Sequence, residues 1–251
     1  SMYKDKNILL TCYNNNLADS YRFKKNCAGL NSDKHRKLYI LTLHKLVAKL
    51  FKECLGKTIE GFATEEQIQE CIDLVKSNQI KIRFKAIFID EVQIFTPLYL
   101  ELCYLLLEKT DDALFLMAGD LNQTVRNQSR RGDAPWKKIN DGRLDFTGRV
   151  KYIEKNYRNC IEVNEFINRF VSEAKKYIKS ISETYNFDSD EFLRGQSFTN
   201  GFGAELIHLS EKTNQAEADI VVKKIIEIHD NKGIPYDEIA VIMHNSKYSG
   251  F

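Results

Sequence analysis

The chain has 251 residues, of which 43% are apolar and 29% are charged. These values are typical of a globular protein with one large domain or two small ones. The formal net charge of +2 excludes a chain that is basic throughout. Any nucleic-acid surface must therefore be a local patch.

Six cysteines occur singly along the chain, with no CxxC pair and no histidine at ligand spacing. This pattern favours reduced thiols in a cytoplasmic protein and argues against a zinc site. No apolar run is long enough to span a bilayer, and the first residues do not resemble a signal peptide. We therefore expect a cytoplasmic protein without a membrane segment.

The first fifty-five residues predict two strand–helix pairs. Residues 7–14 form a short apolar run with a polar end, and a helix is predicted over about 15–25. Residues 38–41 form a second apolar run. The amphipathic helix after it carries its apolar residues between Leu46 and Leu55.

The tripeptide Gly56-Lys57-Thr58 resembles the end of a phosphate-binding loop. Such a loop needs a second glycine five residues before Gly56, and that position is Phe51. An amphipathic helix, not a strand, precedes the glycine. We therefore predict that Gly56 ends this helix. The motif G-x-x-x-x-G-K-[ST] does not occur in the 251 residues.

Further helices and a buried strand are predicted next. Thr64 and Gln67 stand at the spacing of a reciprocal helix cap. Residues 47–80 are therefore predicted to form a helical insertion. A strand is predicted at 86–90 and a largely buried helix at 97–107.

Residues 113–120 predict the next core strand, which ends in an acid, as the strand at 86–90 does. A short strand is predicted at 150–153. Apolar residues at helical spacing from Val163 to Ile181 predict a long amphipathic helix. Residues 183–203 are rich in Gly, Asn, Asp and Ser and predict a connector.

The end of the chain predicts a βαβ unit. Strands are expected at 205–209 and 238–243, with a helix at 213–230 between them. A helix that joins two strands usually implies a parallel sheet. One such unit cannot bury both faces of a sheet, so the sequence predicts the beginning of a further domain.

Two acids follow the apolar run at 86–90, and an amide comes two residues later. Asp90 can hold Mg²⁺ through water, and Glu91 can polarise an attacking water. On their own, these residues fit a core strand that ends in an acidic turn better than they fit a metal site. The other strand ends decide between the two interpretations.

Polar motifs follow four apolar runs, and chance does not readily explain all four. Together they resemble motifs Ia, II, III and IV of the UvrD/Rep-type superfamily 1 DNA helicases, in the same order. Thr42-Leu-His44 is similar to the Thr-x-His signature after motif Ia. The four motifs are Thr11-Cys-Tyr-Asn14, Asp90-Glu-Val-Gln93, Gly119-Asp-Leu-Asn-Gln123 and Asn156-Tyr-Arg158.

The resemblance implies an α/β fold with a RecA-like, P-loop NTPase type of parallel sheet that lacks its first strand and phosphate loop. Residues 1–46 and 81–160 would form this first motor domain, and 47–80 its helical insertion. Residues 161–203 would be a helix and connector, and 204–251 the start of a second RecA-like domain.

The resemblance also implies ATP and Mg²⁺ as ligands. Asp90 would bind Mg²⁺ and Glu91 would activate water. Gln123 would contact the γ-phosphate and Arg158 would reach it like an arginine finger. The nucleotide would also be contacted by Gln93 and Tyr157.

Single-stranded DNA is the implied partner, because aromatic stacking and backbone contacts give sequence-independent binding. Without the resemblance, Tyr13 and Tyr157 would be interpreted as aromatic residues at the edge of a core. His44 would be interpreted as a residue at the start of a helix, and Arg158 as a residue that caps a surface. Arg126 fits a solvated loop, and Trp136 a packing residue. The implied DNA contacts are Thr11, Tyr13, Asn14, His44 and Arg126.

The chain departs from the family at several points. Ile94 replaces the usual acid after Asp-Glu-x-Gln, and the Arg-Gly at 131–132 stands two residues late. The phosphate loop and the late motifs are absent. We therefore expect a helicase fragment that hydrolyses little or no ATP by itself. A non-catalytic RecA-like module that binds nucleic acid or protein, and an RNA-directed helicase, are the alternatives.

Overall fold

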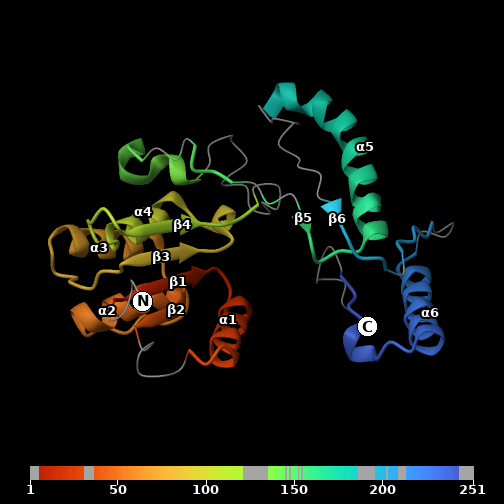
Figure 1. Ribbon diagram of the computed structural model, residues 1–251, viewed down its shortest axis with the longest axis horizontal. Helices are drawn as coiled ribbons and strands as arrows, with labels where there is room; N and C mark the ends of the chain where they lie inside the picture. The colour runs from red at the N-terminus through yellow and green to blue at the C-terminus, as the bar shows by residue number, and fades with distance from the viewer. Residues whose placement is uncertain are drawn as a thin grey trace.

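The computed structural model divides into a sheet-containing first region and a largely helical second region (Figure 1). No helix in the part of the chain that it describes is long and apolar enough to cross a membrane. It describes residues 6–30, 37–120, 135–144, 146, 148–151, 153, 155–185, 196–201, 203–208 and 213–242.

Four parallel strands form the centre of the first region, in the spatial order β2-β1-β3-β4. The α/β class with a parallel sheet is thereby confirmed, and the layout is compatible with a Rossmann-like or RecA-like fold. The strands are β1 (Ile8–Cys12), β2 (Leu38–Thr42), β3 (Ala86–Ile89) and β4 (Leu114–Met117).

Side-chain caps fix where the helices of this region begin and end. Asn14 caps α1 (Asn15–Cys27), and Thr42 caps α2 (Leu43–Leu55). Gly56 ends α2 in the left-handed conformation, at φ +65°, so its predicted role is confirmed. Thr64 and Gln67 form the predicted reciprocal cap of α3 (Glu65–Lys76). Thr96 caps α4 (Pro97–Leu105).

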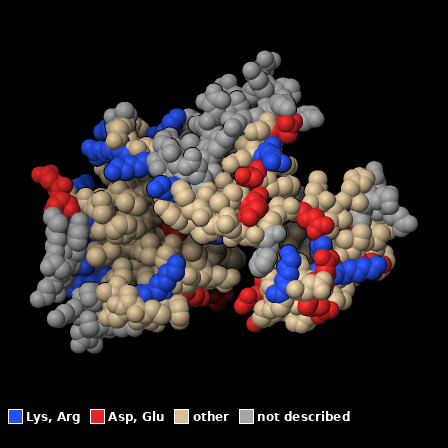
Figure 2. Space-filling model, turned by 45° about the vertical axis from the view of Figure 1, so that its right-hand side comes forward, with Lys and Arg blue, Asp and Glu red and all other residues tan. Residues whose placement is uncertain are grey.

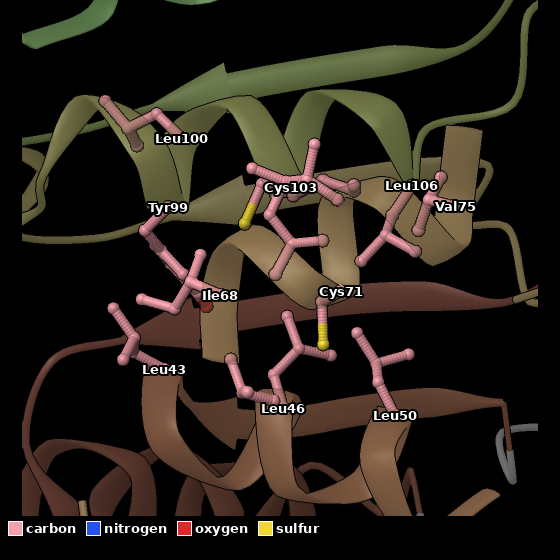
Figure 3. Close-up of a cluster of buried hydrophobic side chains, with 14 of the residues drawn as sticks. Leu43, Leu46, Leu50, Ile68, Cys71, Val75, Tyr99, Leu100, Cys103 and Leu106 are labelled. Carbon is pink, nitrogen blue, oxygen red and sulfur yellow. The ribbon is translucent and has the colours of Figure 1, made fainter. Parts of the chain in front are cut away.

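The main core lies between one face of the sheet and the helices α2, α3 and α4. Figure 3 shows their apolar side chains pointing toward one another. The segment 47–80 therefore contributes to the same core as the sheet. Each fully buried leucine adds about 1.5–3 kcal/mol of hydrophobic stabilisation. The labelled side chains are Leu43, Leu46, Leu50, Ile68, Cys71, Val75, Tyr99, Leu100, Cys103 and Leu106.

The opposite face of the sheet is covered by α1 over β1 and β2, where Cys12, Ala18 and Ile40 are buried. The expectation that β4 is a core strand is wrong. Leu114 and Leu116 on this strand are 37% and 45% exposed. Within the described residues, β4 pairs only with β3, so it is an edge strand and its outward leucines lack cover.

The second region contains two long helices and a two-stranded parallel pair, β5 with β6. A one-turn helix, η7 (Tyr236–Glu238), follows the second helix, and η5 (Pro135–Gly142) precedes the region. The principal elements are β5 (Lys155–Asn156), α5 (Ile161–Tyr185), β6 (Gln196–Ser197) and α6 (Asn214–Lys232).

Three strand predictions in the second region are wrong. Residues 205–208 and 239–242 flank α6 but belong to no strand, and 150, 151 and 153 are likewise outside any strand. Slightly later in the chain, the described residues of β5 do pair, with β6. A strand forms only when a neighbour accepts its backbone hydrogen bonds, and an isolated pair is marginal. The expected start of a second RecA-like domain at 204–251 stays a prediction.

Candidate functional site

The strand register brings three of the four predicted motifs to one edge of the sheet. Thr11 of β1 lies level with Ile89 of β3, and Ile89 lies level with Met117 of β4. The residues that follow these three strands therefore meet at the carboxyl edge. In open parallel sheets this edge is where ligands bind.

Asp90 is the first residue after β3, and two donors hold its carboxylate. Its Oδ1 accepts a hydrogen bond of 3.0 Å from the backbone N–H of Glu91. Its Oδ2 accepts a hydrogen bond from the hydroxyl of Tyr21 on α1. Burial, together with this bond and the charge of Asp90, raises the pKa of Tyr21 above its ordinary value. The phenol is therefore protonated at neutral pH and is the donor.

Glu91 has a backbone conformation that is uncommon for a residue with a side chain. Its φ of 57° and ψ of 44° lie in the left-handed region. Such conformations are costly and gather at functional sites. The turn it begins, η2 (Val92–Ile94), directs the carboxylate toward Gln93 Nε2, which donates a 2.6 Å hydrogen bond to Glu91 Oε2.

Gln93 links the two acidic strand ends. It is 3% exposed, and its Oε1 accepts a 3.2 Å hydrogen bond from the backbone N–H of Asp120, after β4. Both ends of its amide are thus engaged within the protein. Gln93 orients Glu91, and the predicted contact of Gln93 with a nucleotide stays a prediction.

Gly119 allows this close approach. A Cβ atom there would overlap Gln93 Oε1 and lie 2.9 Å from Val92 Cγ1 and 3.0 Å from Val92 N. The clash with backbone could not be relieved by rotating a side chain. The glycine in the predicted motif at 119–123 is therefore explained by packing of the β4 end against η2.

The carboxylates of Asp90 and Glu91 suit Mg²⁺. This ion prefers oxygen ligands and is commonly held by one or two carboxylates, with waters and phosphate oxygens completing the shell. Each oxygen of Asp90 keeps a lone pair beyond its hydrogen bond. Among the described residues no group of three His, Cys, Asp or Glu side chains could hold a metal by itself. The site therefore suits a metal ion whose remaining ligands are waters or phosphate oxygens.

Thr11 lies beneath this edge, and its predicted contact with DNA is wrong. The residue is 0% exposed, and its hydroxyl forms a 2.7 Å hydrogen bond with the hydroxyl of Tyr99 on α4. Thr11 therefore joins the sheet to α4. The neighbouring Cys12 is also buried, and burial and Asp90 raise the pKa of its thiol to about 11. Cys12 is therefore not a nucleophile at neutral pH.

Aromatic rings gather beside the ends of β1 and β2. Tyr13 makes edge contacts with His44 and Phe95, with ring centroids 6.5 and 6.2 Å apart. The His44 ring contacts Phe62 at 4.7 Å, and its Nδ1 accepts a 3.0 Å hydrogen bond from the N–H of Ala63. Sequence reasoning missed Phe62, which is 79% exposed.

Asn14 stands beside these rings and is exposed. Its side-chain oxygen caps α1 by accepting a 2.7 Å hydrogen bond from the N–H of Leu17. The side-chain amide N–H₂ group is the part of Asn14 that could serve a ligand. Tyr13 and His44 are therefore in contact beside Asn14, and the predicted contacts of these residues with DNA stay predictions.

The fourth motif belongs to the second region, on β5. The Asn156 side chain accepts hydrogen bonds of 3.0 Å from the N–H groups of Arg158 and Asn159. The resulting turn presents Tyr157, 74% exposed, stacked on Phe198 with ring centroids 5.9 Å apart. Arg158 is exposed, and among the described residues it forms no hydrogen bond or ion pair with Asp90 or Glu91. The predicted roles of Tyr157 and Arg158 toward a nucleotide stay predictions.

Two predicted site residues, Gln123 and Arg126, lie outside the described residues. Trp136 packs against the main core, as the packing interpretation predicted. Among the described residues on the face shown in Figure 2, basic and acidic side chains are interspersed.

No protein-family model matches the chain, and no curated protein sequence matches it.

Proposed function

We propose that this chain supplies the Mg²⁺-binding and water-activating carboxylates, and part of the single-strand surface, of an ATP-driven DNA translocase or helicase. The observation that carries the proposal is the pair of acids after β3. Asp90 is held by two donors, and Glu91 stands in a left-handed turn with its carboxylate fixed by Gln93.

In this proposal the two carboxylates have different tasks. Asp90 holds the metal through its remaining lone pairs. Glu91 accepts a proton from the attacking water, because its carboxylate is oriented but only partly buried. The metal, when bound, would neutralise charge on the phosphates of ATP. Residues 1–251 contain no phosphate-loop motif, so we expect little or no hydrolysis by this chain alone.

The single-strand surface is the aromatic group beside β1 and β2. Tyr13 and His44 offer ring faces and edges, and Asn14 offers an amide. Stacking of a base on an aromatic side chain contributes about 1–3 kcal/mol and does not depend on the base. These residues lie at the same sheet edge as Asp90, so one surface serves DNA close to the metal-binding acids.

The fluorescence anisotropy of a labelled oligothymidine tests the proposed binding of single-stranded DNA. We expect binding that weakens between 50 and 200 mM salt, as phosphate contacts require. Tyr13→Ala should weaken it by about 5-fold or more, the lower end of the stacking range. Phe23→Ala, which removes a 69% exposed ring on α1, is the matched control. If Tyr13→Ala and Phe23→Ala weaken DNA binding equally, the proposed single-strand surface is contradicted. An oligouridine of the same length tests the RNA alternative.

Binding of Mn²⁺, a spectroscopic substitute for Mg²⁺, tests the catalytic part. Asp90→Asn should abolish the strongest Mn²⁺ site, since an amide is a much weaker ligand than a carboxylate.

The absence of a phosphate-loop motif favours a second candidate, a non-catalytic module that binds nucleic acid. DNA binding without any Asp90-dependent metal binding would favour that candidate over the motor.

A further inference from the structure

Tyr21 connects α1 to the acid after β3. Its ring packs with Leu17 and Leu38 around the small core under α1. Its hydroxyl reaches Asp90, a residue 69 positions later in the sequence. This hydrogen bond joins α1 directly to the carboxyl edge of the sheet.

The geometry at Asp90 is that of an oriented ligand. The backbone N–H of Glu91 fixes Oδ1, and the hydroxyl of Tyr21 fixes Oδ2. These donors come from different elements, so together they restrict rotation of the carboxylate about its terminal bond. A carboxylate has about four lone-pair sites. Two therefore remain for a ligand, in directions set by the two donors.

We propose that Tyr21 is a positioning residue for Asp90, and that its hydroxyl raises the affinity of this carboxylate for a divalent cation. The proposal rests on the proposed function, in which Asp90 holds the metal. Hydrogen bonds to metal-ligating groups fix their orientation, and removing such a partner typically lowers metal affinity 10–100-fold.

Tyr21→Phe isolates the hydroxyl because it keeps the ring that packs under α1. The free Mn²⁺ signal in electron paramagnetic resonance gives the affinity of each full-length variant. We expect Tyr21→Phe to bind Mn²⁺ about 10–100-fold more weakly than the unsubstituted chain. Tyr39→Phe is the matched control. The Tyr39 ring packs edge-on against Phe84 at 5.5 Å, and no hydrogen bond joins it to Asp90. It should bind Mn²⁺ as the unsubstituted chain does.

Wild-type or tighter binding by Tyr21→Phe would overturn the positioning role while leaving the proposed function intact. If the unsubstituted chain shows no binding that depends on Asp90, the proposed function fails and the positioning role fails with it. The two failures are therefore distinguishable in one titration series.

A metal-free measurement guards against loss of folding. Urea unfolding of Tyr21→Phe, Asp90→Ala and the double variant forms a double-mutant cycle, because alanine removes both acceptor oxygens. If the hydroxyl–carboxylate bond exists, the double variant loses less stability than the sum of the two single losses. Additive losses would overturn the contact itself, and with it the positioning role.

Discussion

The two regions of the molecule bury their apolar residues very differently. In residues 6–144 the sheet and helices α2, α3 and α4 enclose a continuous core. In residues 155–242 the only described side chains that are buried are Asn164 and Ala218. There, Phe170 is 68% exposed, Leu206 82% and Ile242 94%. The first region therefore has the burial of an independently stable unit, and the second does not.

This difference follows from how each region satisfies its backbone and its apolar faces. Parallel sheets are usually covered on both faces. The first region has four strands and three helices on one face. Among its described residues, the second has only the pair β5–β6, of two residues each, beside α5, and apolar side chains of α6 are partly exposed. Amphipathic helices gain most of their stability from packing, which is sparse here.

A matched pair of leucines tests this comparison most strongly. Leu46→Ala empties a 0% exposed site in the main core, and we expect the free energy of unfolding to fall by about 2–5 kcal/mol. Leu206→Ala removes the same atoms from an 82% exposed site and should change it by less than about 0.5 kcal/mol. Urea unfolding followed by Trp136 fluorescence measures Leu46→Ala, and urea unfolding followed by the helical circular dichroism of the second region measures Leu206→Ala. Similar losses would show that the second region is packed as tightly as the first.

A matched pair of glycines gives the next largest effect. Gly119→Ala places a Cβ 3.0 Å from Val92 N, which is backbone, and should cost about 1–3 kcal/mol. Gly201→Ala also meets a fixed atom, because its Cβ would lie 2.5 Å from Cys160 Cβ, but this contact belongs to the second region. Its effect on the Trp136 transition should be smaller. If the two substitutions cost the same, the tight fit between the β4 end and η2 is not specific to the first region.

Two helix caps test whether the regions unfold together. The Thr64 hydroxyl accepts a 3.3 Å hydrogen bond from the N–H of Gln67, and the Thr213 hydroxyl a 3.2 Å bond from Ala216. Thr64→Ala should lower the stability of the first region by about 1 kcal/mol. Thr213→Ala should reduce the helical circular dichroism of α6 and leave the Trp136 transition in place. A shift of that transition by Thr213→Ala would mean that the regions fold as one unit.

Local signals in the sequence were sufficient for most of the first region. The predictions of β1, β2, β3 and their helices rest on apolar periodicity, and the caps at Gly56 and Thr64 rest on contacts within one turn. Where a partner strand was needed, prediction failed. The segments at 205–209 and 238–243 have strand-like composition, but the described residues offer them no neighbour.

The candidate site shows the same division. Asp90 and Glu91 follow a recognisable apolar run, so the sequence predicted them. Thr11 was wrongly placed on the surface, although it alternates with buried Leu9 and so faces the core. The bond from Tyr21 to Asp90 spans 69 residues, and no local pattern predicts such a contact.

A buried lysine gives the smallest expected effect, at the opposite end of the sheet from the candidate site. Lys85 is 5% exposed and donates hydrogen bonds to Asp112 and to Thr110 Oγ1, the latter at 2.8 Å. The hydrogen bond from Lys85, followed by that from Thr110, holds the pKa of Asp112 below its ordinary value. The unfolded chain therefore binds a proton to this carboxyl at a higher pH than the folded chain does. The stability from Asp112 is fully present above about pH 4 and is lost as pH falls through the lower, folded pKa.

Asp112→Asn removes this titration, so the acid side of the stability–pH curve should become flatter below about pH 4. Because Asp112 is exposed, the change should be small, and salt should reduce it further. Lys85→Met removes the partner cation and should flatten the same limb of the curve. Urea unfolding at several pH values, followed by Trp136 fluorescence, measures both variants. If the stability–pH curves of both variants run parallel to that of the unsubstituted chain, the Lys85–Asp112 ion pair adds nothing to the stability of the first region. The greater stability of the first region would then come from its apolar core alone.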